Sequence, residues 1–107
     1  MLLRIQFTLP TKRADGSDLP IEEISSIRFY VSTDNGQNFA QAGSAAPGQQ
    51  VFEFDAQDFG TYLFKAETFD TQTPKRDSDD SNIIAFTIET PPKAAPLPPV
   101  LVAIVKA

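Results

Sequence analysis

The sequence predicts an all-β protein in which two antiparallel sheets pack as a sandwich. Apolar residues recur with a spacing of two along most of the chain, which is the pattern of strands with one buried face. Turn-forming residues separate these runs, and no window of ten residues carries an apolar stripe at helical spacing. The length of 107 residues is typical of one domain. The chain has no Cys and therefore no disulfide, but this length allows a hydrophobic core that needs none.

Six strands are expected, and the first three differ in strength. The first two alternate strictly, with Leu3 and Ile5 in one and Ile27 and Phe29 in the other. Asn35-Gly36 then predicts a tight hairpin, because this pair accepts the positive φ angles of a type I′ turn. The third run is a poor strand former, as a short edge strand often is. The six strands are expected at 2–9, 25–33, 37–42, 50–55, 61–70 and 82–90.

The last three strands are marked by their aromatic residues. Phe52 begins the alternation after a turn at Pro47-Gly48, and Tyr62 and Ile84 belong to the two strands that follow. The only helical candidate, residues 21–24, is one turn at most. Six of the nine Phe residues fall on positions expected to face inward and to fill a core without Trp: Phe7, Phe29, Phe52, Phe54, Phe64 and Phe86.

Composition favours a structural or binding role over catalysis. The chain has no His and no Cys, so it lacks the usual general base near neutral pH and the commonest metal ligands. A net charge of −5 argues against nucleic acid, whose binders need a clustered positive face. We therefore expect no catalytic residues, no metal, no cofactor and no nucleic-acid partner.

The sequence shows no targeting or membrane segment. Residues 1–10 lack the basic start and long apolar run of a signal peptide. The longest apolar run, 100–105, is far shorter than the roughly 20 residues that cross a membrane. We expect a soluble protein made in the cytoplasm and not inserted in a membrane, unless the chain is cut from a longer one.

Three segments together resemble a fibronectin type III domain over residues 2–90. Residues 7–20, with Phe7, Pro10 and Asp15-Gly16, look like the second strand of that family and the loop after it. Residues 24–36 look like the third strand and its hairpin, and residues 55–66 look like the sixth strand. The resemblance implies a tyrosine corner at Tyr62, whose hydroxyl is tied to backbone near the start of that strand.

The sequence departs from the family most at its beginning. The family has a first strand ahead of the one that contains Phe7, and here no room remains for it. Phe7 also replaces the usual Trp, and Ala56 replaces the usual Leu before the tyrosine corner. The strand at 2–9 is therefore expected to have an open edge with unpaired backbone groups, unless another segment covers it.

The C-terminal arm, residues 91–107, differs from the rest of the chain. It holds five of the nine prolines, which favour an extended, semi-rigid segment. It carries Lys93 and Lys106 and no acidic residue, whereas residues 1–90 hold all fourteen acidic residues and the other seven basic ones, a charge of −7. The arm ends in an uncharged run with high β-propensity, so we expect it to add as a strand to its own chain, a neighbour or a partner; the alternative is a disordered linker. The predicted contact residues in the arm are Val100, Leu101, Val102, Ile104 and Val105.

A second candidate contact surface lies on the outer face of the sheet, where the alternation places Tyr30, Leu63, Phe69 and Ile83. Tyr30 is the only support for a carbohydrate ligand, because such surfaces usually present a row of Trp or Tyr. The acidic loop residues Asp77, Asp79 and Asp80 fall at the same end as Asp15 and Asp18, but their spacing matches no calcium loop, and a solvated loop is expected.

These features favour a non-enzymatic module that assembles with other proteins, as a homo-oligomer or in a larger structure. Fibronectin-like modules also occur in tailed-bacteriophage virions, as decoration, tail or baseplate parts made in the host cytoplasm without signals. By that analogy the leading expectation is a virion component. The alternative is a spacer or accessory module of a secreted bacterial enzyme or surface adhesin, with the arm as a linker between domains.

Overall fold

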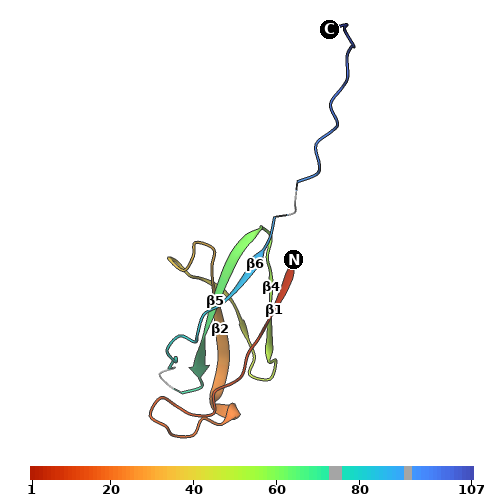
Figure 1. Ribbon diagram of the computed structural model, residues 1–107. Coiled ribbons are helices and arrows are strands. Elements are labelled where there is room, and N and C mark those ends of the chain that lie inside the picture. The colour runs from red at the N-terminus through yellow and green to blue at the C-terminus, as the bar shows by residue number, and fades with distance from the viewer. Residues whose placement is uncertain (73–75, 91–92) are drawn as a thin grey trace.

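A computed structural model describes residues 1–72, 76–90 and 93–107 of the chain (Figure 1). Pro74 and Lys75 of the polar loop, and Pro91 and Pro92 of the arm, lie outside the described residues. The secondary structure consists of strands and one 3-10 turn: β1 (Leu2–Gln6), η1 (Ile21–Glu23), β2 (Ile24–Ser32), β3 (Ala40–Ala45), β4 (Val51–Asp55), β5 (Gly60–Asp70) and β6 (Ile84–Ile88).

The strands form two antiparallel sheets of unequal width. β1 pairs with β4, and the wider sheet has the order β3-β2-β5-β6. Figure 1 shows the narrow sheet lying beside the wide one, with loops at both ends. The prediction of an all-β fold with two antiparallel sheets is therefore confirmed, as is the single helical turn at 21–24.

The third strand lies three residues later than predicted, at Ala40–Ala45. Asn35 and Gly36 do adopt positive φ angles of 62° and 88°, but the connection is longer than a two-residue hairpin. The Asp34 carboxylate accepts the backbone N–H of Asn38 at 2.9 Å, and the Ser32 hydroxyl accepts the N–H of Gly36 at 2.9 Å. These local bonds hold residues 34–38 in a turn, and β3 begins only after it, at Ala40.

Aromatic rings fill the space between the sheets. Phe29 and Phe52 stack with centroids 4.3 Å apart and an interplanar angle of 3°, which joins the two sheets at the centre of the core. Phe54 meets Phe64 edge-on at 5.4 Å. Such ring pairs add to the stability that their burial already provides. The expected inward Phe residues are buried or half-buried except Phe86, which is 49% exposed.

Tyr62 ties the start of β5 to the chain before it. Its hydroxyl donates to the backbone oxygen of Asp58 at 2.9 Å and accepts the Asp58 N–H at 3.2 Å. The ring is buried beside Phe54, and the hydrogen bonds satisfy its only polar atom. The predicted role of Tyr62, a hydroxyl fixed to backbone near the beginning of its strand, is confirmed.

The described part of the arm, residues 93–107, runs away from the sandwich as an extended segment without secondary structure (Figure 1). The molecule is consequently 91 Å long but only 26 and 20 Å across. The arm leaves at the end of the sandwich where β1 begins, which we call the arm end. Its predicted strand segment, residues 100–105, does not fold back onto its own body.

Candidate protein-interaction site

One edge of β1 has no partner in the described part of the chain. β1 pairs with β4 on one side, where Met1 and Ala56 exchange backbone hydrogen bonds and Phe7 N–H donates to Gln50 at 3.0 Å. In an antiparallel ladder, the residues that alternate with such pairs direct their N–H and C=O groups to the opposite edge. Leu2, Arg4 and Gln6 therefore present their backbone groups to a free edge, as the sequence predicts.

Part of the inner face of β6 is exposed: Ile88 is buried, but Ile84 and Phe86, which precede it on the same face, are not. Ile84 pairs directly with Phe64, and Phe86 with Tyr62, so their side chains share the face that is buried on β5. Nevertheless Ile84 is 46% exposed and Phe86 is 49% exposed. The β1–β4 sheet has two strands and leaves these two side chains half exposed, and no described strand lies beyond β1 to extend it.

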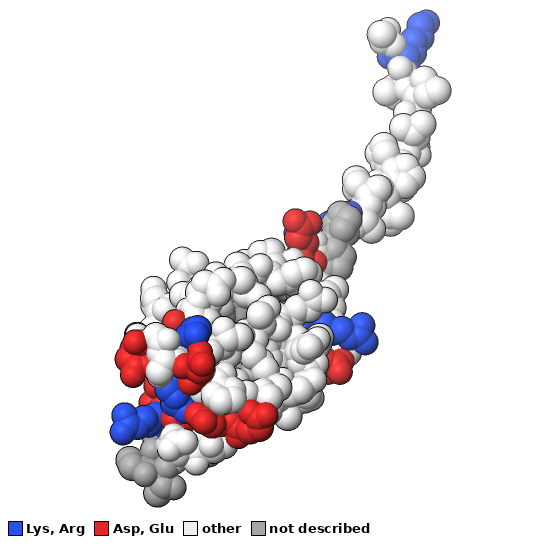
Figure 2. All heavy atoms as spheres, turned by 90° about the horizontal axis from the view of Figure 1, so that it is seen from below, with Lys and Arg blue, Asp and Glu red and all other residues white. Residues whose placement is uncertain are grey.

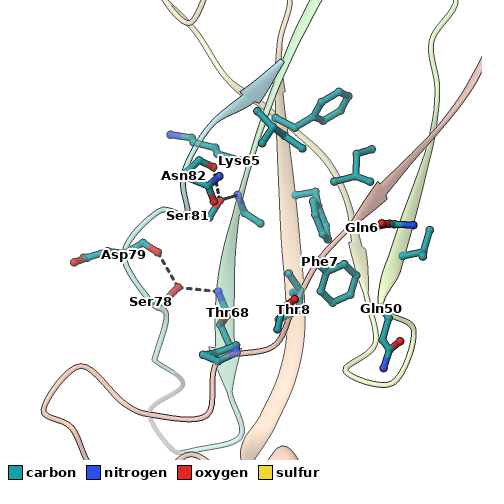
Figure 3. Close-up of a pocket in the computed structure, with 18 residues that line it drawn as sticks. Gln6, Phe7, Thr8, Gln50, Lys65, Thr68, Ser78, Asp79, Ser81 and Asn82 are labelled. Atoms are coloured by element: carbon teal, nitrogen blue, oxygen red, sulfur yellow. Dashed lines mark hydrogen bonds between the residues drawn. The ribbon is translucent and has the colours of Figure 1, made fainter. Parts of the chain in front are cut away.

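A groove of about 960 Å³ lies between the free edge of β1 and the β5–β6 side of the wide sheet. We call it the side groove; Figure 3 shows the residues that line it. Its floor is the apolar core, reached at Phe29 and Phe64, and one wall is formed by Gln6, Phe7 and adjacent residues. The opposite wall comes from the segment 78–84. The side groove therefore combines an apolar floor with unpaired backbone groups along one wall.

Two serine hydroxyls build the wall opposite β1. The backbone N–H groups of Thr68 and Ala66 on β5 donate to the hydroxyls of Ser78 and Ser81, each at 2.8 Å (Figure 3). In return, Ser78 N–H and Ser81 N–H donate to the backbone oxygens of Thr68 and Ala66 at 2.8 Å. The side-chain oxygens thus replace carbonyl acceptors, so the segment follows β5 without being a regular strand.

Asp70, the last residue of β5, anchors this segment at the end of the body opposite the arm end. Its buried carboxylate accepts the backbone N–H of Arg76 at 2.8 Å and a hydrogen bond from the Arg13 guanidinium at 3.1 Å. The Arg76 N–H, with the Arg13 guanidinium, holds the pKa of Asp70 below its usual value. Arg13 also binds Glu23 at 2.7 Å, so a single cation joins the 10–20 loop, η1 and β5.

The arm presents its apolar side chains to solvent. Val100, Leu101, Val102, Ile104 and Val105 are between 84% and 101% exposed, and Leu97 is 91% exposed. Figure 2 shows a cluster of charged groups on the part of the body away from the arm and others on its flank and beside the base of the arm, whereas the arm is uncharged along most of its length and basic at its tip. Exposed apolar residues in one continuous stretch indicate an interaction segment or an aggregation hazard.

The outer face of the wide sheet carries aromatic rings covered by cations. The Arg28 guanidinium lies 4.3 Å from the ring centre of Phe69, and the Lys65 ammonium lies 4.4 Å from that of Phe39 and 6.0 Å from that of Tyr30. These three rings and two cationic side chains make a surface that mixes positive charge with aromatic faces. Tyr30 and Phe69 are accordingly half-buried.

The four residues predicted for this face do not form one continuous apolar surface. On this face of β5, Lys65 and Glu67 lie between Leu63 and Phe69, so two charged residues separate the two apolar ones. The neighbouring Asp77 carboxyl, followed by burial, raises the pKa of Glu67. Ile83 is 54% exposed just before β6. Whether this face contacts another protein stays a prediction.

Three of the acidic loop residues, Asp15, Asp18 and Asp80, are paired with a cation or a hydroxyl. Lys12 binds Asp18, Lys65 donates to Asp80 at 2.8 Å, and the Ser17 hydroxyl donates to Asp15 at 2.6 Å. That hydroxyl and the Ser17 N–H lower the pKa of Asp15. Among the described residues, no three His, Cys, Asp or Glu side chains come together as metal ligands.

Sequence reasoning located the arm and the free edge of β1, but not the side groove. The exposure of Ile84 and Phe86 goes with the two-strand width of the β1–β4 sheet, a width that the alternation of the sequence does not indicate. The serine hydroxyls of the opposite wall have no sequence signal either, because Ser is common in any polar loop. No helix in the described parts of the chain is long and apolar enough to span a membrane.

Comparisons with protein-family models, with curated proteins and with solved structures found no match to this chain.

Proposed function

We propose that this chain is a non-enzymatic structural module that assembles with other protein chains through its C-terminal arm. The observation that carries the proposal is the arm itself, whose segment 100–105 exposes at least 84% of each of five large apolar residues. A stretch of this kind is tolerated in solution only if it has a docking place. Adding a strand to an open sheet edge is an established mode of recognition, and this chain carries both a free strand and a free edge.

The sandwich is proposed to be of fibronectin type III type, without the usual first strand. Two features support it: the order of the strands in two antiparallel sheets, and the Tyr62 hydroxyl bound to the Asp58 backbone. On this proposal the free edge of β1 is the place where the family's first strand would pair. The outer face of the wide sheet is a second proposed contact surface.

The biological setting proposed is a tailed-bacteriophage virion, assembled in the host cytoplasm, with other structural proteins or copies of this chain as partners. The support is an analogy: small fibronectin-like modules without Cys occur in such virions, and a strand-forming arm suits assembly between neighbours. This support comes from fold and composition and not from a site. A carbohydrate ligand is supported only by Tyr30, which here lies near Lys65.

The test is the dependence of assembly on the arm. Light scattering coupled to size-exclusion chromatography would compare the full chain with a chain lacking residues 91–107, over a range of concentrations. A matched pair of variants separates the strand from the linker: Val102→Asn with Ile104→Asn, and Ala94→Asn with Ala95→Asn as the control. We expect assembly in the full chain and the control only. Equal mass for all four proteins would refute the proposal.

A second candidate function is that of a spacer or accessory module in a secreted or cell-surface bacterial protein. It is favoured by Pro96, Pro98 and Pro99, which keep the chain extended as linkers require. This function predicts a monomer with a freely moving arm. Sharp NMR signals from 93–107 at high protein concentration would support the spacer and contradict arm-mediated assembly.

A further inference from the structure

We infer that the side groove of one copy of this chain receives the 100–105 segment of a second copy. This inference rests on the proposed function and deepens it by naming the acceptor site and the partner. The segment would pair with the free edge of β1 and cover the inner face of β6. The chain would thereby complete, between two molecules, the strand that each lacks by itself.

The side groove has the chemistry of a strand site. Gln6 on β1 directs its backbone N–H and C=O toward the groove, and Leu2 and Arg4 continue this free edge toward the arm end, so a strand lying along it can satisfy all three. Across from that edge, Ile84 lines the groove, and Phe86 follows it on the same face of β6; both are about half exposed. An added strand would therefore meet hydrogen-bonding groups along its edge and apolar groups on one face, which is the environment of a sheet edge extended by a partner.

The 100–105 segment has the matching chemistry. Its residues are apolar and mostly β-branched, so either face of the strand can cover Ile84 and Phe86. It contains no charge and no Pro, so every backbone N–H is able to pair. Its flanks carry Lys93 and Lys106, while the body has a charge of −7, with Asp79 on the rim of the side groove. Attraction between the two parts favours this acceptor over a basic surface.

A second copy is favoured over the same chain because of the segment before the strand. Residues 93–99 include Pro96, Pro98 and Pro99 and are extended away from the body. At about 3.1 Å per residue, these seven residues hold the strand roughly 20 Å from its attachment. Docking in the same molecule would require the arm to reverse its direction, whereas a neighbour can be reached without a reversal.

Introduced thiols can identify the acceptor, because the chain has no Cys of its own. One protein would carry Gln6→Cys on the edge of β1, and a set of separately tagged proteins would each carry one Cys at a position from 100 to 105. After mixing and mild oxidation, we expect disulfides between copies, with yields that alternate along the segment as strand residues do. Gln41→Cys, exposed on β3 at the other edge of the wide sheet, is the matched control and should give little product.

Substitutions on β6 provide a second readout that leaves the arm intact. Phe86→Glu puts a charge on the inner face of β6, whereas Ala85→Glu, at the neighbouring position, puts the same charge on the outer face of that strand. Phe86 is already half exposed in the free chain, so both variants should fold, as circular dichroism would verify. We expect Phe86→Glu to weaken association by at least about tenfold and Ala85→Glu to leave it nearly unchanged.

The outcomes separate this inference from the proposed function. Assembly that requires the arm but gives no Gln6 cross-link, or equal cross-linking at Gln6 and Gln41, overturns the inference and leaves arm-mediated assembly standing. A monomeric disulfide in a chain carrying both Gln6→Cys and Val102→Cys also overturns it, because the arm would then dock in its own molecule. Assembly that does not depend on the arm overturns both.

Discussion

Gly43 on β3 provides a sharp test of how the two sheets pack. Its backbone φ of +151° is rarely adopted by residues that carry a side chain. A Cβ added at this position would lie 2.9 Å from Cε1 and 3.0 Å from Cζ of Phe52. The Phe52 ring cannot retreat easily, because it stacks on Phe29 at 4.3 Å. We therefore predict that Gly43→Ala destabilises the fold both through its backbone and through its core.

The magnitude follows from these two contributions. An unfavourable backbone conformation costs about 1–3 kcal/mol. Forcing an extra carbon against a packed ring costs about 1–3 kcal/mol more. The free energy of unfolding should then fall by about 2–6 kcal/mol. Urea unfolding followed by circular dichroism is the suitable assay, because the chain lacks the Trp needed for the usual fluorescence signal. With a slope of about 1–3 kcal/mol per molar urea, the midpoint should drop by about 1 M or more.

Two controls isolate the cause. Gly48→Ala changes a glycine whose added Cβ would meet nothing within 4 Å, so its effect should stay within about 0.5 kcal/mol. Phe52→Leu removes the two ring carbons that clash, so Gly43→Ala should be less harmful in that background, and the difference measures the steric contribution. If Gly43→Ala is as stable as Gly48→Ala, the proposed packing of β3 against Phe52 is wrong.

Two further predictions concern hydrogen bonds. Tyr62→Phe removes both bonds between the hydroxyl and the Asp58 backbone and should lower stability by about 1–3 kcal/mol in the same urea assay; an unchanged midpoint would show that the corner contributes nothing. The Asn38 N–H, together with the Ser32 hydroxyl, lowers the pKa of Asp34 to about 2, so the ionised form favours the fold above pH 3.8 and that contribution is lost as the pH falls toward 2. A carboxyl NMR titration should place the Asp34 midpoint near 2, and a midpoint at the ordinary 3.8 would contradict the hydrogen bonds of this turn.

The sequence was sufficient for features that depend on local pattern. Alternation placed five of the six strands within a few residues. The role of Tyr62 was expected from the resemblance of residues 55–66 to a fibronectin type III strand and not from alternation. Alternation did not predict the position of β3, because Gly43 and Ser44 show no strand pattern and the pairing of β3 with β2 passes through a bulge. Strand pairing of this kind is decided by the neighbouring strand, so a local pattern cannot specify it.

For the candidate site, the arm was predictable and its acceptor only partly so. An uncharged β-branched run after prolines is visible in the sequence itself. The exposure of Phe86 is a different matter, because its alternation is that of a buried residue and only the narrow opposing sheet leaves it uncovered. The ion pair of Arg13 with Asp70 joins residues 57 apart in the chain, which no short-range pattern reports.

The direction of β1 has a consequence for the geometry of any polymer. β1 runs away from the arm end and β6 runs toward it, so the arm departs from the arm end, whereas groove residues such as Phe7, Thr68 and Ser78 lie toward the opposite end (Figure 1). An arm arriving from a neighbour stacked end to end enters from the other end and lies antiparallel to β1, whereas two copies exchanging arms reciprocally would have parallel pairing. The end-to-end arrangement gives a fibre with two different tips, one with an unused arm and one with an empty groove. Growth would then proceed by polar addition, and a single armless copy would terminate it.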